Sequence, residues 1–220
     1  MKVIKTLKKL QKRADEINLF NKEELRKFMK IMDELKETLR EHDELIALSA
    51  PQIGYKYRIF CIKFAGGDIR GYANPMITKT KGYKFSRETQ IGVNDTEYLV
   101  PRFEEVGAQF QNPLGQIDSN LFTGVTSVIF QQMMNIIDGI LLKDIGLEIL
   151  PGFDEASEEE RQEIINLYFN NLSLQNDVLD LTIKSDKTLN AIDKTIDILT
   201  RRNLATVTPI EKEEKDGEKL

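Results

Sequence analysis

Residues that hold transition metals or attack carbonyl groups are almost absent from this sequence. The 220-residue chain has one cysteine, Cys61, and one histidine, His42. Soft transition-metal sites are built mainly from Cys and His side chains, so the sequence predicts no metal and no cofactor. Ser49 has no neighbouring His that would activate it as a nucleophile. Hydrolytic chemistry of the common kinds is therefore not indicated by these residue types.

The remaining reactive side chains lie in segments that favour structural roles. His42 lies in LREHDEL, a charged stretch that is typical of a solvated helix end. Cys61 lies in YRIFCIKF, which predicts a buried strand where a free Cys acts as a small hydrophobic side chain. Glu104 and Glu105 are neighbours in a predicted strand, so their side chains point to opposite faces and do not form an acid–base pair.

Composition and charge limit the partners of the chain. Hydrophobic content of 40% and charged content of 30% are typical of a soluble globular protein. The net charge of −5 argues against a nucleic-acid surface, and no run of about 18 apolar residues predicts a membrane span. The charged N-terminal segment does not resemble a signal peptide, and the cysteine count indicates a reducing compartment. We therefore expect a location in the cytoplasm and no secretion by a signal peptide.

The first long helix is predicted by a cap and an apolar stripe. Asn21 is a good N-cap, and Glu24 three residues later completes a capping-box pattern. We expect this stripe to pack on a core, because its members recur at helical spacing. Its members are Leu25, Phe28, Met29, Met32, Leu35 and Leu39.

The middle of the chain alternates in the manner of β-strands and ends in a helix. The segment 57–64 predicts one strand, and residues 71–88 predict a second strand and a turn. The stretch 97–116 predicts a hairpin that turns at residues 112–115. A helix over 123–137 then ends near Gly139.

The C-terminal third is predicted to be a helical arm with a charged tail. Ser157 and Glu160 form a second capping-box pattern at the start of the arm. We assign 1–150 to a first domain, 151–206 to the arm and 207–220 to the tail. A stripe in the arm is the candidate surface for other protein subunits, and packing on its own domain is the equally weighted alternative. The stripe consists of Leu189, Ile192, Ile196 and Leu199.

Three segments in order resemble the motifs of the peptide deformylase family. LIALSAPQIG, at 45–54, is similar to its first motif, G-x-G-L-A-A-P-Q. A further segment resembles the family and fixes the alignment of the other two motifs, namely VPRFEEVGAQFQN at 100–112. This alignment places the second motif, E-G-C-L-S, on ETQIGV and the third, Q-H-E-x-x-H, on QQMMNIIDG. The resemblance covers about residues 1–150. It implies an α+β fold with an N-terminal helix, antiparallel strands and a central helix, here followed by the helical extension.

The same resemblance implies that the family's chemistry is missing. In the family a Cys and two His hold a divalent metal, and a Glu moves protons. The matching positions here are Gln90, Gln132, Ile136 and Met133 respectively. The family's oxyanion donors are a Gln and a backbone N–H, which correspond to Gln52 and Ile91.

We therefore expect a pseudoenzyme, a structural or assembly part of a larger complex. Because deformylase-like genes occur in tailed bacteriophages, a virion tail or baseplate is a plausible setting by association. Two alternatives remain at this point. One is a binding module that keeps a cleft for N-terminal peptides, and the other is an active deformylase, which the missing ligands disfavour. We expect Met133 and Ile136 to lie in the core, and Gln52 to keep a buried hydrogen-bonding role.

Overall fold

The computed structural model describes residues 10–89, 96–112 and 114–180 of the chain. The chain divides into two compact units, Met1–Gly146 and Leu147–Leu220. The sequence placed its first boundary at 150/151. The predicted tail at 207–220 lies outside the described residues. So do several predicted site residues, namely Gln90, Ile91, Leu189, Ile192, Ile196 and Leu199.

Helix α2 (Lys22–Glu41) begins at the predicted cap. The Asn21 side chain accepts hydrogen bonds from the backbone N–H groups of Glu23 and Glu24, at 2.9 and 3.2 Å. The Glu24 carboxylate accepts from the Asn18 N–H at 2.7 Å, instead of returning to Asn21 as a capping box requires. The helix start is therefore confirmed, with the acidic partner bonded one turn further out.

The buried face of α2 differs from the predicted stripe at one position. Phe28, Met32, Leu35 and Leu39 are buried as expected, and Leu25 is partly buried against the same core. Met29 was wrongly included, because it is 46% exposed. Ile31 is fully buried in its place, since it lies one turn before Leu35 and one turn after Phe28 on the packed side.

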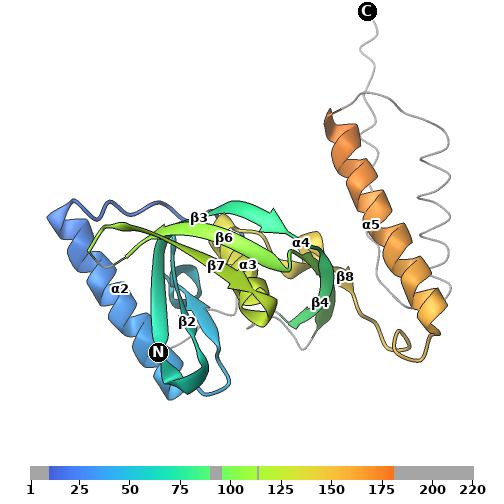
Figure 1. Ribbon diagram of the computed structural model, residues 1–220, viewed down its shortest axis with the longest axis horizontal. Coiled ribbons are helices and arrows are strands. Elements are labelled where there is room, and N and C mark those ends of the chain that lie inside the picture. The colour runs from blue at the N-terminus through green and yellow to red at the C-terminus, as the bar shows by residue number, and fades with distance from the viewer. Residues whose placement is uncertain (1–9, 90–95, 113, 181–220) are drawn as a thin grey trace, which may run out of the picture. The chain divides into compact units, whose positions relative to one another are not determined.

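Unit 1 is built on a five-stranded antiparallel sheet in the order β1-β2-β3-β6-β7. Figure 1 shows β3, β6 and β7 side by side, with β7 at the outer edge. A separate antiparallel pair joins β4 to β5. The strand bounds are β1 Ala47–Ser49, β2 Ile59–Lys63, β3 Ile69–Lys81, β4 Lys84–Thr89, β5 Glu97–Arg102, β6 Glu105–Gln111 and β7 Ile117–Thr123.

The predicted hairpin over 97–116 is divided between two pairs of strands. Its turn is confirmed, because the N–H groups of Asn112 and Gly115 bond to the carbonyl groups of Gln116 and Asn112. This turn joins β6 to β7, whereas β5 pairs with the preceding β4. Alternation alone does not distinguish these partners, because β5 and β6 are separated by only two residues.

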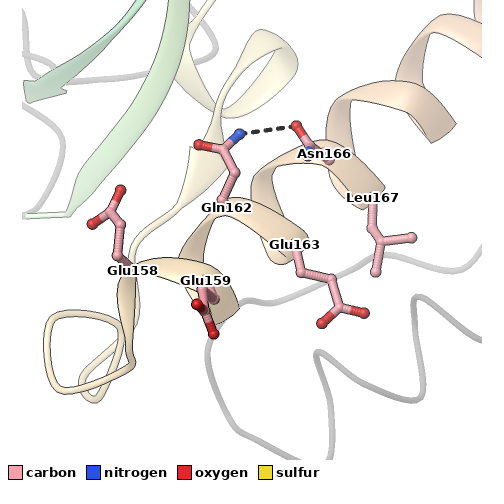
Figure 2. Close-up of a pocket in the computed structure, with 6 residues that line it drawn as sticks. All are labelled: Glu158, Glu159, Gln162, Glu163, Asn166 and Leu167. Carbon is pink, nitrogen blue, oxygen red and sulfur yellow. Dashed lines mark hydrogen bonds between the residues drawn. The ribbon is translucent and has the colours of Figure 1, made fainter.

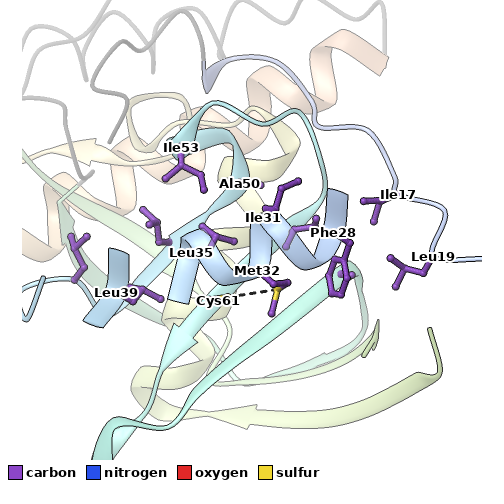
Figure 3. Packing of buried hydrophobic residues seen from close by; sticks show 14 residues of the cluster. Ile17, Leu19, Phe28, Ile31, Met32, Leu35, Leu39, Ala50, Ile53 and Cys61 are labelled. Carbon is purple, nitrogen blue, oxygen red and sulfur yellow. Dashed lines mark hydrogen bonds between the residues drawn. The ribbon is translucent and has the colours of Figure 1, made fainter. Parts of the chain in front are cut away.

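Strand β2 borders two cores because its side chains alternate. Ile59 and Cys61 belong to the core under α2, and Phe60 and Ile62 belong to the core against the central helix. Figure 3 shows the first of these cores, with Cys61 beneath α2. The prediction that Cys61 lies in a buried strand is confirmed.

The central helix, α3 (Gly124–Asp138), confirms the predicted helix and its end. Gly139 caps it in the left-handed conformation at φ 77°. A Cβ atom there would lie 2.8 Å from the backbone carbon of Lys12, so both the turn and the close approach favour glycine. Arg58 forms an ion pair with Asp138 in the last turn, and this pairing anchors the helix to the base of β2. A short helix, α4 (Leu142–Ile145), completes unit 1.

Unit 2 contains strand β8 (Leu147–Glu148) and helix α5 (Glu158–Asp180). The second capping box is confirmed, because Ser157 N–H donates to the Glu160 carboxylate and Glu160 N–H donates to Ser157 Oγ. Ile164 is buried on this helix. Among the described residues, no helix is long and apolar enough to cross a membrane.

Candidate functional site

Parts of the three motif segments meet at α3. A short 3₁₀ helix, η1 (Ala50–Ile53), carries Gln52 and contacts α3. On α3, Gln132 Nε2 donates to the Thr89 carbonyl oxygen at 3.2 Å, at the end of β4. Thr89 immediately precedes Gln90 in the sequence. The fold therefore assembles the region in which the resemblance places the family's active site.

The first motif forms a closed hydrogen-bonding turn. Gln52 is fully buried, and its Oε1 accepts from Ser49 N–H at 2.9 Å and from Ser49 Oγ at 2.8 Å. Gly54 ends the turn at φ 97°, a conformation that glycine adopts readily. The predicted buried hydrogen-bonding role of Gln52 is thus confirmed for its oxygen. Its Nε2 has no hydrogen-bond partner among the described residues.

The inner side of α3 is apolar. Met133 is fully buried and Ile136 is 3% exposed, and both belong to the core that contains Phe60, Tyr72 and Phe130. They lie three residues apart, so the helix places them on one face. The prediction that these two positions are core is confirmed. Neither side chain offers a nitrogen, a thiolate or a carboxylate to a ligand.

Glutamine amides on α3 are committed to backbone groups. The buried Gln131 accepts from Phe103 N–H at 3.0 Å and donates to the Phe103 carbonyl at 2.9 Å and the Ser127 carbonyl at 3.1 Å. Gln132 is half-buried and reaches Thr89. These amides attach the helix to the ends of β4 and β5. They stabilise the region without converging on a common point.

A buried ion pair that sequence reasoning missed lies beside this helix. Arg102 Nε and Nη2 donate to the two carboxylate oxygens of Glu88 at 2.6 and 2.7 Å, and both side chains are almost fully buried. Arg102 Nη1 also donates to Asn135 Oδ1 on α3. Such two-pronged pairing is among the strongest polar contacts in proteins. Glu88 is 14 residues and Asn135 is 33 residues from Arg102 in the sequence, so no local motif reveals these contacts.

The only thiol and the only imidazole of the chain lie away from α3. Cys61 is buried on the α2 side of β2, with Sγ 3.8 Å from Met32 Sδ, and burial raises the pKa of its thiol to about 12. His42 caps the end of α2, where its ring is 40% exposed and bonds to Glu44, in agreement with the predicted solvated helix end. In the part of the chain that the structure describes, no group of three or more His, Cys, Asp or Glu could hold a metal ion.

A hollow of about 600 Å³ in unit 2 is lined by residues of α5 alone. Figure 2 shows these side chains along one helix, where Gln162 donates to Asn166 at 2.9 Å. Three of the six lining residues are glutamates, and one of them, Glu158, is already paired with Arg161 at 2.7 Å, so the hollow presents no convergent set of groups. It lies in a different unit from the three motifs, and we assign it no ligand.

Comparison with known proteins agrees with the geometry of unit 1. The family model of polypeptide deformylases matches residues 2–146. The chain belongs to the polypeptide deformylase family. The peptide deformylase of Symbiobacterium thermophilum is 27% identical over 140 residues, which cover 61% of this chain and 63% of that protein. Across three such relatives, the match spans 63 to 66% of their length.

Solved structures support the fold. The peptide deformylase of Thermus thermophilus superposes with a TM-score of 0.57 at 22% identity, covering 73% of this chain and 87% of that one. A probable peptide deformylase of Synechococcus phage S-SSM7 has a TM-score of 0.57 at 23% identity, covering 66% and 97%. The predicted α+β deformylase-like fold is therefore confirmed.

The described residues do not fit the metal that this family implies. At the motif positions Ile136 is a buried hydrocarbon, Met133 is packed in the core, and Gln132 donates to a backbone carbonyl. Protein sites for iron, nickel or zinc use imidazole, thiolate or carboxylate groups. The three motif positions on α3, which are Gln132, Met133 and Ile136, offer none of these groups.

Proposed function

We propose that this chain is a non-catalytic deformylase-like protein that serves as a structural or assembly component of a larger complex. The observation that carries the proposal is the burial of Met133 and Ile136 in the core where the family places its catalytic Glu and a metal ligand. Two buried hydrocarbon side chains therefore stand where the family has a proton carrier and a metal ligand, and neither can hold an ion or activate water.

The chemical argument extends to the whole sequence. A bound metal lowers the pKa of water from about 15.7 to about 7, which supplies the hydroxide for hydrolysis at neutral pH. With one His and one Cys in 220 residues, no other register restores a Cys-His-His site. The apolar side chains that fill the position each contribute about 1.5–3 kcal/mol on burial. This packing offsets the stability that a bound metal would otherwise provide.

The assembly role is supported by association and by the predicted arm. One relative of the same fold is a phage protein, so a tail or baseplate of a bacteriophage virion is the proposed setting. The predicted stripe of Leu189, Ile192, Ile196 and Leu199 is the proposed contact with other protein subunits. Nucleic acid is not a proposed partner, given the net charge of −5, and a membrane is not, given that no run of about 18 apolar residues occurs.

Two measurements on the full chain test the absence of catalysis. Elemental analysis of the purified protein is expected to find no stoichiometric iron, nickel or zinc. Formate release from a formyl-Met peptide is expected to equal the buffer blank, with a metal-loaded relative such as the Symbiobacterium thermophilum enzyme as positive control. A tightly bound metal together with formate release would refute the proposal.

Native size tests the assembly role. The protein is expected to migrate in a large complex in extracts of its natural source, and the double variant Ile192→Glu, Ile196→Glu is expected to leave that complex. A fully monomeric wild-type chain in such an extract would contradict the role. Assembly that survives the double variant would instead reject the stripe as the contact surface.

One observation favours the peptide-binding alternative. The buried Gln52 Nε2 has no partner among the described residues, and an amide in this state is a free donor. Titration with a formyl-Met peptide separates this alternative from the assembly role. We expect a flat response, and saturable binding that is lost in Gln52→Ala would favour the binding module.

A further inference from the structure

The two edges of the five-stranded sheet differ in protection. At one edge, β1 has three residues, all of them buried. At the other edge, β7 has seven residues, of which the first five are exposed. An unpaired edge offers N–H and C=O groups to any added strand. The β7 edge is therefore the side on which this sheet can grow.

Strand β7 lacks the features that usually prevent edge pairing. Its sequence, IDSNLFT, contains no lysine and no proline, and Asp118 is its only charged residue. Ile117 is 71% exposed and Leu121 is 49% exposed. Large apolar side chains on an open edge are unfavourable in a monomer and favour contact with a partner.

One local contact identifies the backbone groups of β7 that point to the open edge. Leu121 N–H donates to the side chain of its neighbour Asn120 at 3.0 Å, so it points away from β6. Backbone groups alternate in direction along an antiparallel strand, so those of Ser119 and Ile117 point to the same open side. In the sheet itself, Ser119 lies opposite Gln109 of β6.

We infer that β7 pairs antiparallel with β7 of a second copy of this chain, with Ser119 at the two-fold axis. In this register Ile117 of each copy faces Leu121 of the other, and Asp118 faces Asn120 of the other. Apolar side chains then meet apolar ones, and like charges do not face each other. Because the pattern is self-complementary, one surface supplies both halves of a closed dimer.

Other registers of the same pairing are less favourable. Moving the axis to Asp118 places the two Asp118 side chains directly opposite each other, which costs stability. Moving it to Asn120 places Leu121 opposite Ser119 and loses the apolar pair. The contact is short compared with the roughly 1,200–2,000 Å² of a stable interface. We therefore expect a dimer that dissociates on dilution.

Disulfide trapping tests the register directly. Residues that face each other across a hydrogen-bonded antiparallel pair have Cα atoms about 5.5 Å apart, within the range of a disulfide. Full-length Ser119→Cys is expected to cross-link at least 10-fold faster than Gln109→Cys, a matched variant on the same face but one strand inward. Native Cys61 is buried and does not interfere. Equal cross-linking rates for the two variants would overturn the inference.

Sedimentation velocity of the full chain over a 100-fold concentration range supplies the second test. The wild type is expected to dimerise with concentration. Ser119→Lys is expected to remain monomeric, because two lysines meet at the axis, while Gln109→Lys is expected to dimerise like the wild type. Asn120→Asp, which places it against Asp118 of the other copy, is expected to weaken the dimer about 10-fold at low salt and less at high salt. Monomeric wild type, or equal effects of the two lysine variants, would refute the inference.

This inference rests on the proposed assembly role and adds to it a contact between two copies of the chain. Separate experiments can refute the contact and the role. A chain that is monomeric in isolation yet enters a large complex in extract would refute the β7 contact and keep the role. The absence of catalysis is tested by metal and formate alone, whatever the size of the particle.

Discussion

The two sides of α3 differ in chemistry although both are largely buried. One side carries Gln131 and Asn135, which hydrogen-bond at the end of β5, Gln131 to Phe103 and Asn135 to Arg102. The other carries the apolar pair that fills the motif positions of the family. Residues that are two positions apart in an α-helix, such as Gln131 and Met133, are rotated by about 200° about its axis, so the two sides are nearly opposite.

This difference shows which polar groups are compatible with a buried helix that has no ligand. A buried polar group is tolerated when its hydrogen bonds are made inside the protein, as those of Arg102 are. Groups that bond only to an ion or a water lose their partner when that ligand is absent, and they then cost stability. Met133 and Ile136 avoid that cost on the inner side.

The largest expected effect comes from breaking the buried ion pair beside the polar side. Arg102→Met leaves the Glu88 carboxylate buried without its partner, which is expected to destabilise the fold by about 3–5 kcal/mol in urea unfolding. The matched control is Arg70→Met, because Arg70 bonds Asp68 at a similar 2.7 Å but on the surface. That control is expected to cost at most about 1 kcal/mol. Equal losses would mean that burial does not distinguish the two pairs.

The inner side is tested by removing packing volume. Met133→Ala is expected to cost about 2–5 kcal/mol of unfolding free energy, because it opens a cavity among fully buried side chains. Met29→Ala removes the same atoms from an exposed position of α2 and is expected to change stability by about 0.5 kcal/mol or less. A small effect at Met133 would indicate a loosely packed centre, with space for a ligand.

Local patterns in the sequence predicted the parts of the fold that depend on neighbouring residues. The start of α2 at Asn21 and the end of α3 at Gly139 follow from cap residues. Met133 and Ile136 were expected in the core because the resemblance places these apolar side chains where the family has a Glu and a His. Each of these features is encoded within a few residues, so no tertiary information was needed.

The features that the sequence did not predict depend on distant segments. Met29 and Ile31 are both apolar, and only the core under α2 decides which is buried. The pairing of Arg102 with Glu88 and Asn135 brings together two strands and a helix. Strand β5 pairs with β4 and not with β6, although the alternation of its residues fits either partner.

A smaller effect is expected from the polar side of α3. Gln131→Leu leaves the N–H group of Phe103 without its side-chain partner, while the Phe103 carbonyl keeps its hydrogen bond from Ser127 Oγ, and the loss is expected to cost about 1–3 kcal/mol. Gln132→Leu is the matched control. It removes a single hydrogen bond, to Thr89, which is more exposed than those of Gln131, and is expected to cost about 1 kcal/mol or less. The ratio of the two losses, measured by chemical denaturation, reports how far the polar side stabilises the fold.

The smallest effect concerns Cys61, and it appears only at high pH. Burial raises the pKa of its thiol from 9.0 to about 12, so between these values the unfolded chain loses the proton while the folded chain keeps it. Stability from this group is therefore complete below pH 9 and is lost as the pH rises toward 12, with a slope of at most about 1.4 kcal/mol per pH unit. Cys61→Ala is expected to remove that component from the pH dependence of urea unfolding. If the variant shows the same pH dependence as the wild type, burial does not raise the pKa of the Cys61 thiol in the folded protein. The thiolate would then be available as a ligand.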